Sequence, residues 1–403
     1  MPEEDIKSRQ LESGTIDSAE RLVSIVKCTR TDDPDSVLEA TLESLNLIGG
    51  LELLISPGDT VLLKPNVLCP FNYRTGAVTN PHLVRAMCRL ARAAGAKKVI
   101  IAESAAIGFD DTMEAFAGSG IAAVAREEKA ELVDLLDTPI LCMGIPNGIV
   151  LRRLQVPEIV MQADVLINLP VMKTHDVFPA TLGLKNMKGV LRQQDKKKFH
   201  RWGLAQAIVD LNKLVLPQLT VIDGTVAMEG IGPVYGTPVN LGVIVSSFDT
   251  VSADAVAATV MGIDPMEIEY IKLAAEQGLG CADLSQIQVR GSSIDDVKKE
   301  FKTTRVDFDS YREQGFWIHE SGACSGCHHF MESLLTFHMK ENLDLLKGYT
   351  IIFGQTVTPP EKIEGELLSF GSCTRRYRNQ GGYIAGCPPH GLDVVEYLRA
   401  RKR

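Results

Sequence analysis

The chain has 403 residues, of which 45% are hydrophobic and 23% are charged, an ordinary composition for a globular protein of two or three domains. Its 42 basic and 51 acidic residues give a formal net charge of −9, which argues against a general nucleic-acid binder because such proteins are usually basic. The sequence contains no apolar, uncharged run long enough to cross a membrane, so we predict no membrane span.

The first twenty residues are polar and acidic. They lack the basic and apolar regions of an export signal, so we expect a flexible tail at 1–20 and a cytoplasmic protein. The nine cysteines then point to metal binding rather than to disulfides, because thiols stay reduced in that compartment.

Short apolar segments predict strands at 22–28, 60–64, 98–102, 163–169, 219–223 and 241–246. Helical patterns between them cover 34–45, 79–94 and 251–261, the second with Asn80 as N-cap and Pro81 in its first turn. Strands that alternate with helices imply βαβ units. We therefore expect an α/β domain over 21–292, with a largely parallel sheet and flanking helices.

Polar residues gather where these strands end, which is where ligands bind in open α/β sheets. Lys64 and Asn66 follow the strand at 60–64, and Asn80 begins the next helix. A helix start offers N–H donors to an anion, so we expect these three residues to bind a cofactor or substrate. Capping and turn formation alone is the alternative.

The segment after strand 163–169 is the richest in such residues. Lys173, His175, Lys185 and Asn186 lie around a glycine-rich turn, and these residue types suit a phosphate or carboxylate. We expect Lys173 and His175 to act in catalysis, and Lys185 and Asn186 to bind the ligand. The run Lys196–Lys198 is expected to be a solvated loop that only adds long-range attraction.

Two carboxylates form a third group. Asp223 ends the strand at 219–223, and Glu229 lies in the glycine-rich loop that follows. Such carboxylates could bind a divalent metal ion or act as acid and base. The loop is not a Walker loop, and no GxGxxG follows a strand, so a standard P-loop or dinucleotide fold is not expected.

At these motifs the chain resembles a known family. The blocks KPN, TNP, KTH…GLKN..G and DG….MEG.GP..G match the family catalogued as domain of unknown function 362, over about residues 22–290. The resemblance implies a bacterial or archaeal protein of a kind often joined to iron–sulfur modules, and it implies no substrate. More distantly, this domain is similar to the lactate-racemase family.

Four cysteines lie in the last ninety residues: Cys324 and Cys327 in a C-x2-C pair, Cys373 in FGSC and Cys387 in AGCPPHG. Four thiolates can hold a [4Fe–4S] cluster. Structural zinc, two disulfides and ordinary buried thiols are the alternatives. We favour the cluster because zinc sites more often show two close pairs, whereas thirteen residues separate Cys373 from Cys387.

The order of strand, C-x2-C, helix, GSC and GCPP resembles the proximal-cluster region of nickel–iron hydrogenase small subunits and the related cluster subunit of respiratory complex I. The resemblance covers about residues 314–403 and implies that the four cysteines are the cluster ligands. We expect a strand at 315–319 and a helix at 328–346 around the first pair. They would belong to a small α/β iron–sulfur domain at 314–403, after a linker at 293–313.

These features predict an iron–sulfur redox enzyme that acts on an anionic small molecule or cofactor bound by the large domain. The alternative is a non-catalytic [4Fe–4S] electron-transfer or assembly partner of a larger redox complex. A redox partner protein and a homo-oligomer are left open.

Overall fold

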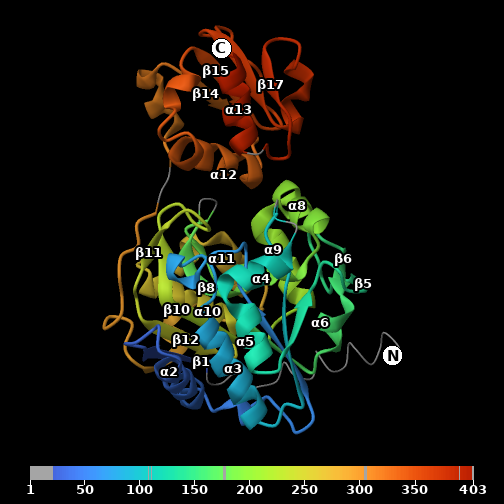
Figure 1. Ribbon diagram of the computed structural model, residues 1–403, viewed down its shortest axis with the longest axis vertical. Helices are drawn as coiled ribbons and strands as arrows, with labels where there is room; N and C mark the ends of the chain where they lie inside the picture. The colour runs from blue at the N-terminus through green and yellow to red at the C-terminus, as the bar shows by residue number, and fades with distance from the viewer. Residues whose placement is uncertain are drawn as a thin grey trace. The chain divides into compact units, whose positions relative to one another are not determined.

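The computed structural model describes residues 21–401 except 108, 110, 176–177, 304–305 and 390. The expected tail at 1–20 lies outside these residues. The chain divides into two compact units, Met1–Thr303 and Thr304–Arg403, and each is described by itself (Figure 1). No helix within the described ranges has both the length and the apolar character needed to cross a lipid bilayer.

An eleven-stranded sheet forms the centre of the first unit, with the order β13-β1-β12-β10-β7-β2-β3-β4. Off this order, β8 and β11 pair with β10, and β9 pairs with β8. Its strands are β1 (Arg21–Lys27), β2 (Thr60–Pro65), β3 (Lys98–Glu103), β4 (Glu131–Asp134), β7 (Val165–Leu169), β8 (Val171–Thr174), β9 (Ala180–Thr181), β10 (Leu219–Glu229), β11 (Thr237–Val239), β12 (Val243–Ser247) and β13 (Ile287–Gly291). In the main order, β12 is antiparallel to β1 and β10, and every other neighbouring pair is parallel. The predicted α/β class with a largely parallel sheet is therefore confirmed. A separate hairpin consists of β5 (Ile140–Gly144) and β6 (Arg153–Pro157).

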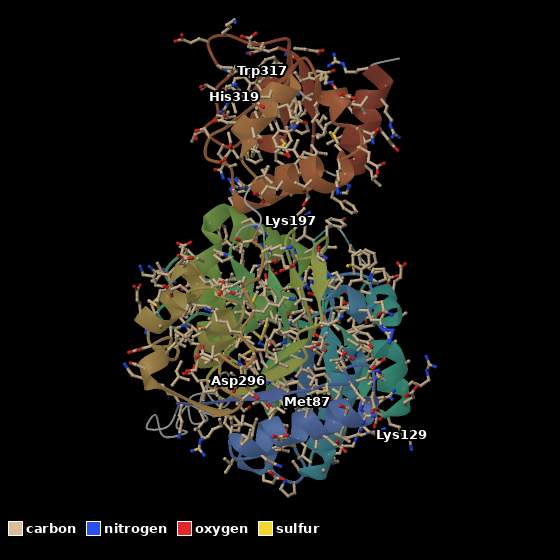
Figure 2. All side chains as sticks on the ribbon, turned by 90° about the vertical axis from the view of Figure 1, so that its left-hand side faces the viewer. Met87, Lys129, Lys197, Asp296, Trp317 and His319 are labelled. Atoms are coloured by element: carbon tan, nitrogen blue, oxygen red, sulfur yellow. The ribbon has the colours of Figure 1, made fainter. Side chains whose placement is uncertain are left out.

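Helices cover both faces of this sheet because its strands bury side chains on both faces. Along β2, Val61 and Leu63 pack into one hydrophobic core and Leu62 into the other. The first core includes α2 (Pro34–Leu47), α3 (Pro81–Ala93), α4 (Thr112–Ser119) and α5 (Ile121–Glu127), and the second includes α9 (Leu204–Leu214), α10 (Thr250–Val260) and α11 (Glu269–Glu276). The remaining helices of the unit are α6 (Glu158–Gln162), α7 (Gly183–Asn186) and α8 (Gln193–Trp202). Met87 of α3 is buried, whereas Lys129 after α5 is exposed (Figure 2).

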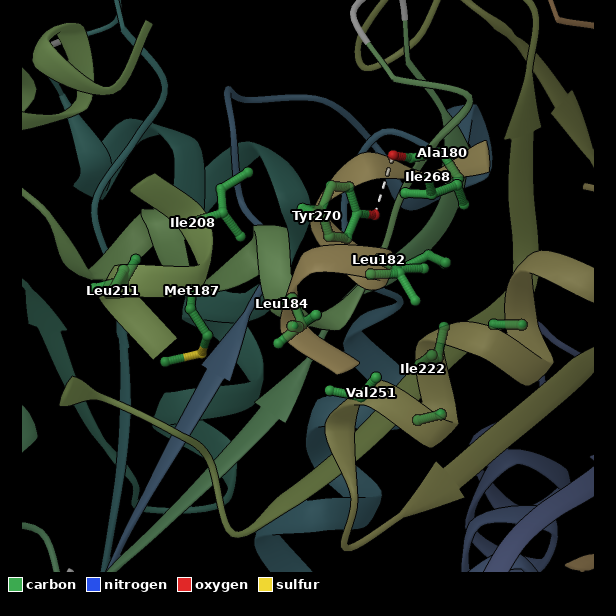
Figure 3. Packing of buried hydrophobic residues seen from close by; sticks show 14 of the residues in the cluster. Ala180, Leu182, Leu184, Met187, Ile208, Leu211, Ile222, Val251, Ile268 and Tyr270 are labelled. Atoms are coloured by element: carbon green, nitrogen blue, oxygen red, sulfur yellow. Dashed lines mark hydrogen bonds between the residues drawn. The ribbon is translucent and has the colours of Figure 1, made fainter. Parts of the chain in front are cut away.

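The second core fixes the segment that leads into α7. Leu182 and Leu184 pack with Val251 and with residues of α9 in a buried cluster (Figure 3). The hydroxyl of Tyr270 donates a hydrogen bond of 3.2 Å to the carbonyl oxygen of Ala180. The chain therefore enters α7 from a position held on both sides by buried contacts.

The second unit contains four parallel strands in the order β14-β15-β16-β17. They are β14 (Trp317–Glu320), β15 (Tyr349–Phe353), β16 (Glu366–Phe370) and β17 (Gly382–Ile384), with helices α12 (Ser325–Ser333) and α13 (Gly391–Arg401). Trp317 and His319 lie on β14 (Figure 2). The helix expected at 328–346 is wrong in its bounds: α12 begins and ends earlier, and a π-helical turn, Leu334–His338, and a 3-10 turn, Leu343–Leu346, follow it.

The expected linker at 293–313 is divided between the two units. On the first unit, Val297 and Phe301 are buried, and the Phe301 N–H donates to the Met261 carbonyl oxygen at 3.0 Å. On the second unit, Tyr311 of a 3-10 turn, Phe308–Gln314, packs its ring 5.3 Å from that of Phe316. The other 3-10 turns are Leu51–Leu53, Tyr73–Thr75, Met187–Val190, Pro265–Glu267, Leu284–Gln286 and Ser372–Tyr377.

Candidate functional site

The strand order of the first unit reverses between β2 and β7. From β2 the chain continues to β3 and β4 on one side, while β7 and β10 lie on the other. Ligands of parallel α/β sheets bind outside the carboxyl ends of the strands at such a switch point. Here those ends carry Lys64 in β2, Asn66 directly after β2, and Asn168 in β7 beside Lys64.

A buried ion pair lies at this edge of the sheet. The Lys64 ammonium contacts the Glu103 carboxylate at the end of β3, and both side chains are withdrawn from solvent. Glu103 also accepts from the Ser104 N–H at 2.9 Å. Gly189 packs directly against the pair, because a Cβ at that position would overlap Glu103 Oε1 and lie 2.6 Å from Lys64 Nζ.

Lys196 joins the same group, which corrects the prediction of a solvated loop at 196–198. The residue belongs to α8, is 4% exposed, and donates to the carbonyl oxygens of Ser104 at 2.8 Å and Ala105 at 2.7 Å. The physical reason is that its long side chain reaches inward to carbonyls at the end of β3. Lys197 and Lys198 of the same run are exposed.

Burial dominates the electrostatics of this cluster. It lowers the pKa of Lys64, against the opposing effect of Glu103, and it raises the pKa of Glu103, against the opposing effects of Lys64 and Lys196. It also lowers the pKa of Lys196 to about 8. Glu103 thus acts on both buried lysines, Asp134 also acts on Lys196, and the charges of Glu103 and Lys64 reach Lys173.

Lys173 lies on β8, at the same edge of the sheet as Lys64 and Asn66. Its ammonium donates to Asn66 Oδ1 at 2.6 Å, to the Ala77 carbonyl at 2.7 Å and to the Pro233 carbonyl at 3.3 Å. These bonds join three loops. Complete burial lowers the pKa of Lys173 to about 7, so the residue can gain or release a proton near neutral pH.

The short helix α7 presents the next pair of predicted residues. Its first two N–H groups, from Gly183 and Leu184, donate to the buried carboxyl group of Asp254 at 2.6 and 2.9 Å. Lys185 Nζ then donates to Thr181 Oγ1 at 3.0 Å. Desolvation by burial raises the pKa of Asp254 to about 8, against the opposing effect of these N–H donors.

Asn186 is connected directly to the switch point. Its Nδ2 donates to Asn168 Oδ1 at 2.8 Å, and Asn168 Nδ2 donates to the Gly183 carbonyl at 2.9 Å. The Oδ1 atom of Asn186 is buried and accepts no hydrogen bond from any residue that the structure describes. An unused buried acceptor is costly, so this atom suits a donor group on a ligand.

Lys64, Asn66, Lys173, Lys185 and Asn186 are thus the predicted residues that hydrogen bonds and strand pairing bring to one edge of the sheet. Sequence reasoning missed Lys196 and Asp254, and it did not select Glu103 although the residue ends a strand as Lys64 does. The position of Glu103 was the available signal. A lysine in a basic run gives no comparable signal.

The other predicted residues have different surroundings. Both oxygens of Asp223 are occupied, since they accept from the Asn80 N–H at 2.7 Å and from the N–H and hydroxyl of Thr225 at 2.9 and 2.6 Å. Asn80 caps α3 as predicted, with Oδ1 accepting from the His82 N–H at 2.9 Å. These contacts anchor the start of α3.

Two predicted residues remain. Glu229, at the end of β10, accepts from the Lys302 N–H at 3.1 Å and so fastens the segment before the second unit. His175 directly follows β8 and is half-buried.

In the second unit, the four cysteines come from three segments that each follow a strand of the sheet. Cys324 and Cys327 follow β14, Cys373 follows β16, and Cys387 follows β17. Because these strands are parallel, their carboxyl ends meet at the same edge. The Ser372 N–H donates to the Gly386 carbonyl at 2.7 Å, which joins the loops of Cys373 and Cys387.

The space between these loops is narrow. Gly371 has φ of 88°, and a Cβ there would lie 3.5 Å from Cys327 Sγ and 3.7 Å from the Gly386 carbonyl. A hydrogen bond from Cys327 lowers the pKa of Cys324 to about 5, whereas the same bond, burial and the three other thiols raise the pKa of Cys327. The thiols of Cys324, Cys373 and Cys387 therefore all lie within electrostatic reach of Cys327.

All nine cysteines are free thiols, so the disulfide alternative is not supported. Among the described residues, no three His, Cys, Asp or Glu side chains are gathered closely enough to hold a single metal ion. A [4Fe–4S] cube takes one thiolate at each iron, so its ligands stand farther apart than the ligands of one tetrahedral zinc ion. Four thiols are a donor set that suits a [4Fe–4S] cluster and also a structural zinc ion.

Comparisons with known proteins give a family, a relative and a solved structure to which this chain is similar. A solved lactate racemase apoprotein from Thermoanaerobacterium thermosaccharolyticum is 14% identical with a TM-score of 0.39, and the match covers 61% of this chain and 58% of that chain. The thylakoid-associated protein sll1697 of Synechocystis sp. (strain ATCC 27184 / PCC 6803 / Kazusa) is 30% identical over 270 residues, which are 64% of this chain and 79% of the relative. The family model named domain of unknown function (DUF362) matches residues 61–259. The chain therefore belongs to the DUF362 family.

Proposed function

We propose that this protein is an iron–sulfur oxidoreductase whose first unit binds an anionic small molecule at the β2–β7 switch point. The observation that carries the proposal is the charge balance there: the buried carboxyl group of Glu103 faces the buried lysines Lys64 and Lys196, with Lys173 nearby. Burying a charge without a partner is costly. A phosphate or carboxylate would add negative charge beside these lysines.

The polar groups at this edge suit such a ligand. Lys185 would pair with the anion, since a charge-assisted hydrogen bond is stronger than a neutral one. The buried Oδ1 of Asn186 would accept a hydrogen bond from a hydroxyl or amino group of the same molecule. Asp254 and Asn168 would act indirectly, because they hold the backbone of α7 in place.

Binding of inorganic phosphate and of small carboxylates, measured by calorimetry, tests this part of the proposal. A charge-assisted contact is worth roughly 1.5–3 kcal/mol, so Lys185→Ala should weaken binding by about tenfold or more. The exposed Lys197 is the matched control, and Lys197→Ala should leave affinity nearly unchanged at moderate salt. Equal losses in the two variants would place the ligand elsewhere.

In the second unit we propose a [4Fe–4S] cluster held by Cys324, Cys327, Cys373 and Cys387. Such a cluster supplies one-electron transfer when it is bound. The support is the convergence of the four thiols at one sheet edge and the small residue, Gly371, beside Cys327. Cys373→Ser should lose most of the iron from protein prepared without oxygen, whereas the control Cys142→Ser, at an exposed cysteine of β5, should retain it.

One observation favours the second candidate function, an electron carrier without a substrate of its own. The side chain of Cys387 is exposed, so a cluster bound there would approach the surface of the unit and could exchange electrons with a partner protein. A pure carrier should bind no small anion at Lys185, which separates the two functions.

A further inference from the structure

A cavity of about 920 Å³ lies away from the lysine cluster, at another part of the same first unit. It is formed by residues that follow β1, by the 3-10 turn Tyr73–Thr75, by β10 from Thr225 onward, and by the start of β12. The segment Asp296–Lys299 supplies a further wall. Its volume is in the usual range for small-molecule sites, roughly 300–1,000 Å³.

The cavity is separate from the proposed site at Lys185. Thr225 lines it, and Asp223 lies behind Thr225 with both carboxylate oxygens already bonded. Tyr73 and Arg74 lie in a 3-10 turn. Shortly after this turn, the carbonyl oxygen of Ala77 accepts a hydrogen bond from Lys173. A ligand could therefore occupy this cavity whether or not an anion binds at Lys185.

Positive charge predominates among the lining residues. Four cationic side chains, Lys27, Arg74, Lys298 and Lys299, compare with two carboxylates, Asp32 and Asp296. Arg74 approaches Asp32 only at 3.8 Å, with both side chains largely exposed, and such pairs are weak. In a chain whose net charge is −9, this local excess favours an anion.

The wall that carries two of these lysines is firmly attached. Val297 is buried in the core of the unit, and the Lys299 N–H donates to the Val260 carbonyl oxygen at 2.9 Å. Lys299 makes no ion pair with any residue that the structure describes, whereas Lys298 approaches Glu300 at 3.1 Å. The Lys299 ammonium is thus available to a ligand at a fixed position of the backbone.

The remaining lining is apolar in part. Tyr73, Val226, Leu241 and Val243 contribute to it, and Tyr73 and Val226 belong to a buried hydrophobic cluster. We propose that the cavity binds a small molecule with a multiply charged anionic group and an apolar body, such as an aryl phosphate. The lysines would hold the anionic group, and the apolar side chains would cover the body.

Calorimetry on the full chain with phenyl phosphate, inorganic phosphate and benzyl alcohol tests this proposal. Phenyl phosphate should bind with one-to-one stoichiometry at this cavity and at least about tenfold more tightly than inorganic phosphate, and benzyl alcohol should not bind measurably. Equal affinities for the two phosphates would overturn the assignment of an apolar body, and no binding of phenyl phosphate would overturn the site.

A variant with Lys27→Gln, Lys298→Gln and Lys299→Gln should weaken phenyl phosphate binding at least tenfold while retaining the melting temperature of the native chain. The control removes the same charge from exposed lysines outside the cavity, with Lys97→Gln, Lys129→Gln and Lys272→Gln. Equal losses in both variants would show general attraction and overturn the proposal. If Lys185→Ala weakens phenyl phosphate binding and the triple variant of Lys27, Lys298 and Lys299 does not, the ligand binds at the switch point and the cavity proposal is overturned.

Discussion

Lys173 holds its ammonium among three neutral oxygen atoms, and its protonation should therefore affect stability. Its pKa is about 7 in the fold and 10.5 without burial. Between these values the unfolded chain binds more protons than the folded one, so the free energy of unfolding rises with pH, by up to about 1.4 kcal/mol per pH unit.

Urea unfolding from pH 8 to pH 10 measures this contribution. The pKa of Asp254 is about 8. Below pH 8 this residue makes the free energy of unfolding fall with pH, which opposes the effect of Lys173. Across most of the window from pH 8 to pH 10 Asp254 has lost its proton in the fold. Lys173→Met should show a smaller rise of the unfolding free energy with pH than the native chain. Identical slopes would mean that Lys173 remains charged in the fold.

Lys196 allows a second prediction at the scale of the residue. Lys196→Met would leave the carbonyls of Ser104 and Ala105 without their donor, and buried unpaired polar groups cost about 1–3 kcal/mol each. The free energy of unfolding should fall by that order, whereas Lys197→Met, at an exposed position of the same helix, should change it by less than about 0.5 kcal/mol. Similar values for both variants would contradict the buried contacts.

Lys64, Lys173 and Lys196 differ in how far the sequence alone predicts their place in the site. Lys64 and Lys173 were predictable because each follows an apolar strand, and strand ends are where ligands bind. Lys196 was not, because its neighbours Lys197 and Lys198 make the run look solvated, and the carbonyls that it reaches are about 90 residues away in the sequence. Such partners depend on the tertiary structure.

Gly189 packs against residues at the ends of β2 and β3, and this contact leads to a prediction at the scale of the element. Its backbone passes against the Lys64–Glu103 pair, so the Cβ in Gly189→Ala would collide with that pair. Overpacking of a buried site typically costs about 1–3 kcal/mol. The variant should be destabilised by that amount and should bind the anion more weakly.

Gly144→Ala is the matched control, because a Cβ at Gly144 has no heavy atom within 4 Å. It should leave the melting temperature unchanged or raise it slightly, since alanine reduces the entropy of the unfolded chain. If both variants melt at the same temperature, Gly189 does not pack against the ion pair as described.

Elements with a strong apolar pattern were predicted well. The strand expected at 98–102 is β3 (Lys98–Glu103), and the helix expected at 34–45 is α2 (Pro34–Leu47). The helix α8 was missed because ten residues with only Phe199 and Trp202 as large apolar side chains give little periodicity. The strand expected at 219–223 continues to Glu229 because β8 and β11 pair with its second half, which no local pattern reveals.

At the scale of the whole molecule, the chain combines a large α/β unit with a smaller one that carries the four cysteines. The linker expected at 293–313 was read from its charged residues, but Val297 and Phe301 within it bury their side chains on the first unit. Two apolar residues among many charges are a weak signal in the sequence. Their burial also forms the cavity wall that carries Lys299.

One measurement tests the proposed [4Fe–4S] cluster of the second unit most directly. The most direct measurement is the iron, sulfide and zinc content of protein purified without oxygen from iron-replete cells, together with its visible and electron paramagnetic resonance spectra before and after reduction. The account predicts brown protein with about four irons and four sulfides per chain, and a spectrum that integrates to about one reducible cluster per chain. Colourless protein that contains zinc, or no metal, would contradict it.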